Sequence, residues 1–109
     1  MVVLGSAQDG GLPQIACDEP LCRAAREEPE RVRWPSSLLL IDPRAGTRWL
    51  FDASPRLPEQ YERARDWLPA RPRALAGRPP LFDAIFLSHA HFGHFTGLSW
   101  LGREVYGAQ

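Results

Sequence analysis

The sequence contains no lysine, only two cysteines and no long hydrophobic run. Because all 13 basic residues are arginines, chemistry that needs a lysine Schiff base is excluded. Two cysteines can close at most one short loop, so a disulfide-based scaffold is excluded as well. The longest apolar stretches, residues 36–41 and 84–87, are much shorter than the roughly 20 residues of a membrane span. The N-terminus also lacks the charged and apolar segments of a signal peptide, and we therefore expect a cytoplasmic protein that does not enter membranes.

Net charge is lacking too, because 13 arginines balance 13 acidic residues. A chain without net positive charge lacks the electrostatic attraction on which much nucleic-acid binding depends, so no nucleic-acid partner is expected. Hydrophobic residues make up 44% of the chain and charged residues 24%, which is typical of a folded globular domain and unlike a disordered segment.

The pattern of apolar residues predicts short secondary-structure elements, in keeping with eleven prolines and nine glycines. Alternating or continuous apolar runs predict strands at 2–4, 37–42, 47–53 and 83–88. Helical spacing predicts helices at 20–28, from 55–58 to just before Pro69, and at 97–106 with Thr96 as the N-cap. Pro43 and Gly46 lie between two strand formers and predict a hairpin turn. Residues 84–87 are apolar throughout, which is typical of a strand covered on both faces.

This order of elements is typical of a layered α/β domain. We expect residues 1–109 to form one partial domain. Four strands and three short helices would leave a sheet with an open edge, and so short a chain buries only about two-thirds of its surface. The sequence therefore predicts a fragment of a larger domain.

All three histidines, His89, His91 and His94, lie within six residues directly after the last predicted strand. Ligands of α/β proteins commonly bind at the carboxyl ends of strands. Two histidines two positions apart in extended backbone point to the same side, and a third can return once the chain turns. Imidazole nitrogens at this spacing suit zinc first, and iron or manganese as well. The alternative is three unrelated histidines, which so tight a cluster disfavours.

The segment from Ser88 to His94 resembles the His-x-His-x-Asp-His signature of the metallo-β-lactamase superfamily. Residues 4–14, 51–55 and 94–104 are similar to the coenzyme PQQ synthesis protein B family. The resemblance implies the N-terminal half of an αββα sandwich. It also implies a metal-dependent enzyme in pyrroloquinoline quinone biosynthesis, or in a related small-molecule oxidation or hydrolysis. The expected substrate is a small molecule or is derived from a peptide.

One residue departs from the superfamily signature. Gly93 stands where the signature has an aspartate that, by the resemblance, ligates a second metal ion and orients water. Without this carboxylate, one zinc or iron ion at the histidines is expected rather than two. The departure also disfavours a phosphodiester or ester hydrolase, which stays as an alternative beside a non-catalytic carrier of PQQ or its precursor. If further ligands come from the rest of the fold, the chain alone is expected to be inactive.

Three further groups are candidate site residues. Relatives hold a structural zinc through Cys-x-Cys-x-x-Cys, and here Cys17, Glu19 and Cys22 occupy that motif; the alternative is two free cysteines. Asp9, in a glycine-rich loop, is either a turn-forming residue or part of the site lining. Asp52 is expected to be a buried structural acceptor rather than a catalytic acid.

Overall fold

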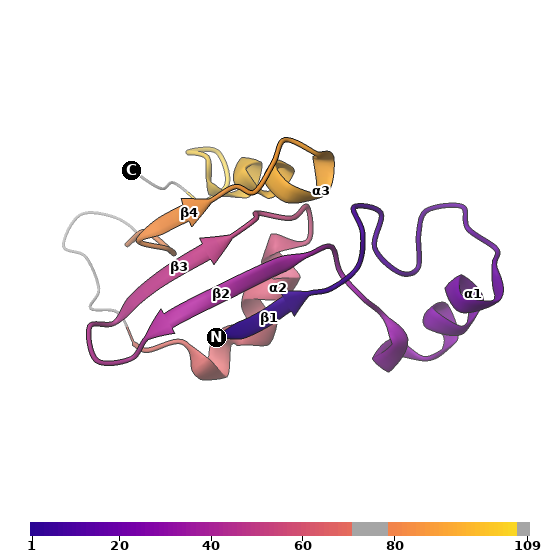
Figure 1. The fold of residues 1–109 in the computed structure, drawn as a ribbon, viewed down its shortest axis with the longest axis horizontal. Coiled ribbons are helices and arrows are strands. Elements are labelled where there is room, and N and C mark those ends of the chain that lie inside the picture. The colour runs from indigo at the N-terminus through magenta and orange to yellow at the C-terminus, as the bar shows by residue number, and fades with distance from the viewer. Residues whose placement is uncertain (71–78, 107–109) are drawn as a thin grey trace.

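The computed structural model describes residues 1–70 and 79–106 (Figure 1). Its strands are β1 (Val2–Gly5), β2 (Ser37–Asp42), β3 (Thr47–Phe51) and β4 (Ala84–Phe86). Its α-helices are α1 (Pro20–Glu27), α2 (Leu57–Ala64) and α3 (Phe92–Phe95). Short 3-10 helices follow them, namely η1 (Pro29–Arg31), η2 (Arg65–Trp67) and η3 (Thr96–Leu101).

The four strands form one sheet in the order β1-β2-β3-β4. The β1–β2 and β2–β3 pairs are antiparallel, whereas β3 and β4 are parallel. The predicted hairpin between β2 and β3 is confirmed: the backbone N–H groups of Arg44 and Ala45 donate to the carboxylate of Asp42, and Gly46 takes a positive φ of 71°. Because β3 and β4 are parallel, their carboxyl ends meet at the same edge of the sheet.

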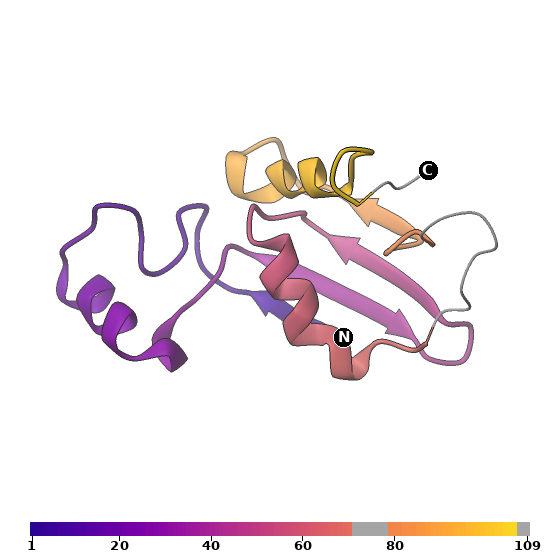
Figure 2. The same cartoon turned by 180° about the vertical axis from the view of Figure 1, so that it is seen from behind.

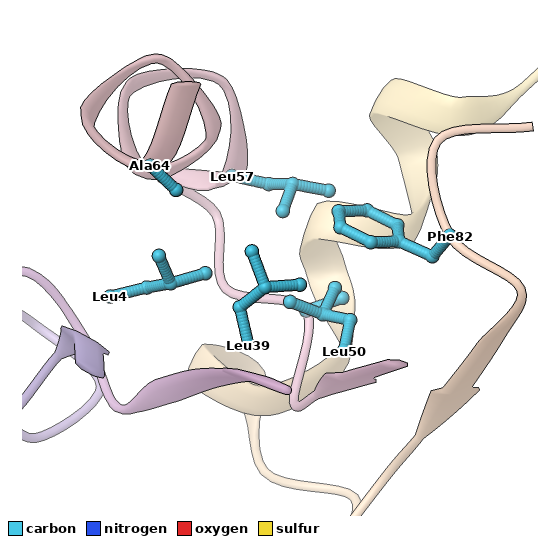
Figure 3. Packing of buried hydrophobic residues seen from close by; sticks show 7 residues of the cluster. Leu4, Leu39, Leu50, Leu57, Ala64 and Phe82 are labelled. Carbon is cyan, nitrogen blue, oxygen red and sulfur yellow. The ribbon is translucent and has the colours of Figure 1, made fainter. Parts of the chain in front are cut away.

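The hydrophobic core lies between one face of the sheet and helix α2, which crosses that face (Figure 2). Leu4, Leu39 and Leu50 point from the strands toward Leu57 of α2, and Phe82 closes the side (Figure 3). These side chains alternate along β2 and β3 with residues of the other face, as the pleat of a strand requires. The predicted helix is confirmed and ends at Ala64, after which the chain tightens into η2.

The other face of the sheet is also apolar but remains exposed among the described residues. Val3, Leu40, Phe51 and Phe86 lie on it, and the rings of Phe51 and Phe86 stack with centroids 5.0 Å apart. The prediction that β4 is covered on both faces is wrong for this structure, since Phe86 is 49% exposed. Both faces of β4 carry apolar side chains, but among the described residues none packs over the face that carries Phe86.

Two predicted elements also differ from the structure. Strand β3 ends at Phe51 because Asp52 takes a positive φ of 62° and leaves the extended conformation. The predicted helix at 97–106 is instead α3 followed by η3, and Thr96 is not its N-cap, because its hydroxyl donates to the carbonyl of Phe92. Gly97 lies against the backbone of residues 53–54 and donates to the carbonyl of Ala53. This close docking replaces the regular helix that the spacing predicted.

Helix α1 lies apart from the sheet, in a lobe formed with η1 and the loop after β1 (Figure 1). It begins at Pro20, as predicted from the fixed φ of proline in a first helical turn. In the part of the chain that the structure describes, no helix is long and apolar enough to cross a membrane.

Candidate metal centre

The histidines lie at the edge of the sheet where β3 and β4 both end. His89 and His91 follow β4, and His94 lies on α3. Two backbone hydrogen bonds attach α3 and η3 to the end of β3: Ala53 N–H donates to the carbonyl of His94, and Gly97 N–H donates to that of Ala53. The parallel pairing of two strands and this docking together bring the three imidazoles to one place.

Asp52 connects the three elements of the site. Its carboxylate accepts hydrogen bonds from the backbone N–H of Ser88 at 2.7 Å and from the Ser88 hydroxyl, and it contacts Nδ1 of His94 at 2.8 Å. The residue is only 8% exposed. Burial acts to raise the pKa of Asp52, but the hydrogen bonds from Ser88 and His94 and the positive charge of a protonated His94 hold this pKa below its usual value.

The hydroxyl of Ser88 lies between Asp52 and His89, and the sequence analysis assigned this residue no role. Its Oγ is 2.7 Å from Oδ2 of Asp52 and 2.9 Å from Nδ1 of His89. A hydroxyl has one hydrogen to donate, and the ionised carboxylate can only accept it. Oγ therefore accepts from Nδ1–H of His89, which leaves Nε2 of that ring with a free lone pair. The only hint in the sequence was the position of Ser88 between the strand and the first histidine.

The lone pair of His89 points toward His91. Nε2 of His89 and Nδ1 of His91 are 3.1 Å apart. The ring of His89 also lies 4.6 Å from that of His91 and 4.0 Å from that of His94, between centroids. Two nitrogens bound to one tetrahedral zinc at about 2.0–2.1 Å would lie about 3.3 Å apart. The His89–His91 pair thus fits two ligands of a single ion in both donor type and spacing.

Asp9 reaches the site from the loop after β1. Its Oδ1 is 3.3 Å from Nε2 of His94. A turn closed by Gly11 N–H donating to the carbonyl of Gln8 also places Asp9 within a tight bend. Asp9 thus lies in a turn and also beside His94, and Asp52 is a buried acceptor of hydrogen bonds.

These donors lie in pairs rather than in a closed shell. Among residues 1–70 and 79–106, no three His, Cys, Asp or Glu side chains are placed to hold one metal ion together. A cavity of about 470 Å³ opens beside the pairs and is lined by Gln8, Asp9, Gly10, Gly11, Gln14 and His91. A larger cavity of about 680 Å³ lies between α2 and η3, has mostly apolar walls and contains none of the candidate ligands. Of these two cavities, the smaller one is lined by one of the three histidines, His91.

The cysteine motif lies in the separate lobe with α1. The structure joins Cys17 and Cys22 in a disulfide, and their Cα atoms are 6.0 Å apart, within the usual range for such a bond. This differs from both expectations, a zinc-binding thiolate pair and two free cysteines, because bonded sulfurs cannot ligate a metal. Glu19 is the exposed residue before α1 and makes no capping hydrogen bond there. A structural zinc at Cys17, Glu19 and Cys22 stays a prediction for the reduced chain.

No protein-family profile matches the chain. It is 36% identical over 99 residues to coenzyme PQQ synthesis protein B of Methylobacterium radiotolerans, an alignment that covers 90% of this chain and 32% of that protein. The protein of the same name from an Azoarcus species is 37% identical over 100 residues, with 91% and 32% covered. An octanoyltransferase of Porphyromonas gingivalis is 34% identical over 97 residues, 89% of this chain but only 16% of that protein.

The chain is also similar to two solved structures. The crystal structure of Zn(2+)-bound PqqB from Methylobacterium extorquens matches with a TM-score of 0.71 and 28% identity, over 92% of this chain and 32% of that one. A diphosphatase from the PhnP family matches with a TM-score of 0.66 and 26% identity, over 99% of this chain and 37% of that one.

The fold and site therefore define the class: the chain is a mixed α/β structure that corresponds to part of a metallo-β-lactamase-type fold, as predicted. Within this class, its resemblance to coenzyme PQQ synthesis protein B extends over about 90% of the chain. The chain spans about a third of the length of these relatives.

Proposed function

We propose that the chain supplies the histidine side of the metal centre of a PQQ synthesis protein B-like enzyme, which acts on a small-molecule or peptide-derived substrate in cofactor biosynthesis or a related oxidation or hydrolysis. One observation carries the proposal: Nε2 of His89 and Nδ1 of His91 face each other at 3.1 Å. Two nitrogen lone pairs that face each other at this distance repel, so a proton or a cation must lie between them. The zinc bound by the structural relative PqqB supports zinc as that cation, and iron is the alternative.

The residues behind the histidines support this assignment. Metal-binding imidazoles commonly use their second nitrogen to contact a carboxylate or another polar group, which fixes the ring and its tautomer. His94 makes this contact with Asp52 directly, and His89 makes it through the hydroxyl of Ser88. The chain thus holds two rings, those of His89 and His94, in which Nδ1 is engaged and Nε2 is left with a lone pair.

A zinc or iron ion held by His89 and His91 would supply Lewis-acid activation of water or of a substrate oxygen, and iron would add redox chemistry. The other tasks belong to the chain itself. Ser88 and Asp52 orient the rings and keep them in the metal-binding tautomer. The cavity beside Asp9 and His91 admits a small substrate. Its polar lining from Gln8 and Gln14 suits hydrogen bonding to a carboxylated or quinone-like molecule better than burial of an apolar one.

The experiment that tests the proposal is metal content by elemental mass spectrometry on protein purified without oxygen. We expect the His89→Ala, His91→Ala double variant to lose the metal ion bound between these two histidines, so that its metal content falls. A variant of an exposed residue on α2, Glu62→Ala, serves as the control and should retain it. Full metal content in the double variant would contradict the proposal. One iron per chain would make precursor hydroxylation the next assay, whereas zinc would make hydrolysis the next.

A phosphodiester hydrolase is the second candidate, favoured by the likeness to a PhnP-family diphosphatase and by the carboxylate of Asp9 beside His94. Metal-dependent turnover of a chromogenic phosphodiester, lost in the His94→Ala variant, would establish it. Tight binding of PQQ or its precursor without any turnover would instead indicate a carrier, which the cavity beside His91 could also serve.

A further inference from the structure

Gly93 has no side chain, and the space next to its Cα is filled by another residue. A Cβ atom built on Gly93 would lie 2.7 Å from Cα of Asp9 and 2.8 Å from both its Cγ and its Oδ1. Real side chains almost never approach so closely. Gly93 is therefore required for the approach of the loop after β1, and the atoms that approach it are those of a carboxylate-bearing residue. A carboxylate thus lies beside position 93 although residue 93 itself has none.

The neighbour of that carboxylate is His94, whose other ring nitrogen is held by Asp52. Nδ1 of His94 contacts Oδ2 of Asp52 at 2.8 Å, and since the carboxylate can only accept, Nδ1 carries the proton. In the neutral ring, Nε2 then presents a lone pair, and it faces Oδ1 of Asp9 at 3.3 Å. Two acceptors facing each other repel unless a proton or a cation lies between them. The distance is the separation, about 3.3 Å, of two ligand atoms on one tetrahedral ion.

We propose that Asp9 is a metal ligand that takes the place of the carboxylate missing at position 93, and that Oδ1 of Asp9 and Nε2 of His94 together bind a divalent cation of the zinc type. This inference rests on the proposed function, since it adds a second cation position beside the His89–His91 pair. The sequence predicted one metal ion rather than two, because Gly93 has no carboxylate. In this proposal Asp9 supplies a carboxylate from another loop, and a second cation is expected. The chain's own ligands would then be divided into a nitrogen pair and a nitrogen–oxygen pair.

The test is a titration of the metal-free protein with Co²⁺, followed by the visible absorption bands that report cobalt coordination and by calorimetry for the number of ions and their Kd. The Asp9→Asn variant keeps the size of the side chain but removes its charge. We expect this variant to lose one cobalt site, or to bind it at least tenfold more weakly, with a changed cobalt spectrum. The matched control, Asp66→Asn, makes the same chemical change at an exposed position of η2 and should bind as the unmodified chain does.

Two further variants keep the outcome unambiguous. The His89→Ala, His91→Ala variant should lose the other cobalt site and retain the one at Asp9; loss of neither site would refute the proposed function itself. If cobalt binding depends on His89 and His91 while Asp9→Asn has an unchanged count, Kd and spectrum, the proposed function stands and Asp9 only forms an ion pair with a protonated His94. Circular dichroism of the Asp9→Asn variant, expected to match that of the unmodified chain, ensures that a loss of metal does not come from unfolding.

Discussion

Nδ1 of His94 lies 2.8 Å from Oδ2 of Asp52, a residue 42 positions earlier in the sequence. The same carboxylate accepts from the backbone and the hydroxyl of Ser88. Asp52 thereby joins the end of β3, the end of β4 and helix α3. Its unusual backbone conformation, with φ at 62°, directs the side chain into this junction rather than along the strand. The three histidines owe their common location to a residue that is not itself a candidate metal ligand.

The first prediction concerns removal of this acceptor. Asp52→Ala would leave the partly buried N–H of Ser88 and Nδ1 of His94 without their partner, and we expect the free energy of unfolding to fall by about 1–3 kcal/mol. Zinc affinity should fall about 10–100-fold, because the ring of His94 is no longer held. Urea denaturation in the presence of EDTA measures the first effect, and zinc titration the second. Asp66→Ala, an exposed aspartate of η2, should change neither; an equal effect of both variants would contradict the role of Asp52.

The second prediction follows from the lowered pKa of Asp52. A carboxyl whose pKa is lower in the folded than in the unfolded chain stabilises the fold above the unfolded pKa, which is about 3.9 for aspartate. This stabilisation is lost as the pH falls through the lower, folded pKa. The stability difference between the metal-free chain and its Asp52→Asn variant should therefore shrink as the pH falls below about 4. Urea unfolding at a series of pH values measures it, and a difference that grows on acidification would refute the prediction.

The third prediction concerns the hydroxyl of Ser88. In the Ser88→Ala variant, Nδ1 of His89 loses its acceptor, so the ring is expected to populate both neutral tautomers. Nitrogen NMR of the metal-free chain should show a shift of His89 from the Nδ1–H form toward a mixture, with little change at His94, which keeps its contact with Asp52. Ser88→Thr retains the hydroxyl and should behave like the unmodified chain. Unchanged nitrogen shifts of His89 in Ser88→Ala would show that Oγ does not select the tautomer.

Local chemistry explains which parts of the fold the sequence predicted well. The β2–β3 hairpin depends on Asp42, Pro43 and Gly46, all within or next to the turn, and α2 depends on the spacing of its own apolar residues. The helix expected at 97–106 failed because Gly97 docks on the backbone after β3, a contact between distant segments. No local pattern encodes such a contact. The prediction that β4 is covered on both faces was wrong for the same reason, because cover depends on segments distant in the sequence.

For the site too, features that depend on local sequence were predictable, and contacts between distant segments were not. The histidine cluster was visible in the sequence because its spacing is short and its residue type is rare in the chain. The contacts of Asp9 and Ser88 were not visible, since each depends on a partner supplied by another element; the sequence offered Asp9 only as a turn-forming or site-lining residue. Gly93 suggested the loss of a carboxylate, and only the three-dimensional approach of Asp9 shows that another carboxylate lies there.

The fourth prediction concerns the exposed apolar face of the sheet. Phe51 and Phe86 stack on it and are 37% and 49% exposed, beside Val3 and Leu40. Apolar patches of this kind bind hydrophobic dyes and promote association. The chain should enhance the fluorescence of anilinonaphthalene sulfonate and self-associate at high concentration in analytical ultracentrifugation. Phe86→Ser should reduce both effects, whereas Leu21→Ser, which changes an exposed apolar residue of α1 in the separate lobe, should not. Equal effects of the two variants would place the binding surface elsewhere.

The last prediction concerns Gln60, a fully buried polar residue of α2. Its amide Nε2 donates to the carbonyl of Pro35 at 2.9 Å, and its Oε1 accepts from the hydroxyl of Ser54 at 2.7 Å. Both partners flank the site, because Ser54 follows Asp52 and Pro35 precedes the strand β2. Replacement by alanine leaves the carbonyl of Pro35 without its donor and the hydroxyl hydrogen of Ser54 without its acceptor, and it opens a cavity. Gln60→Ala should therefore lower the free energy of unfolding by about 3 kcal/mol. Glu62→Ala, on the exposed side of the same helix, should change the free energy of unfolding by at most about 1 kcal/mol.

Because the loop that carries Asp52 loses its support, Gln60→Ala should also weaken zinc binding at temperatures where the chain remains folded. Unchanged zinc affinity in a destabilised variant would show that α2 stabilises the fold without positioning the histidines.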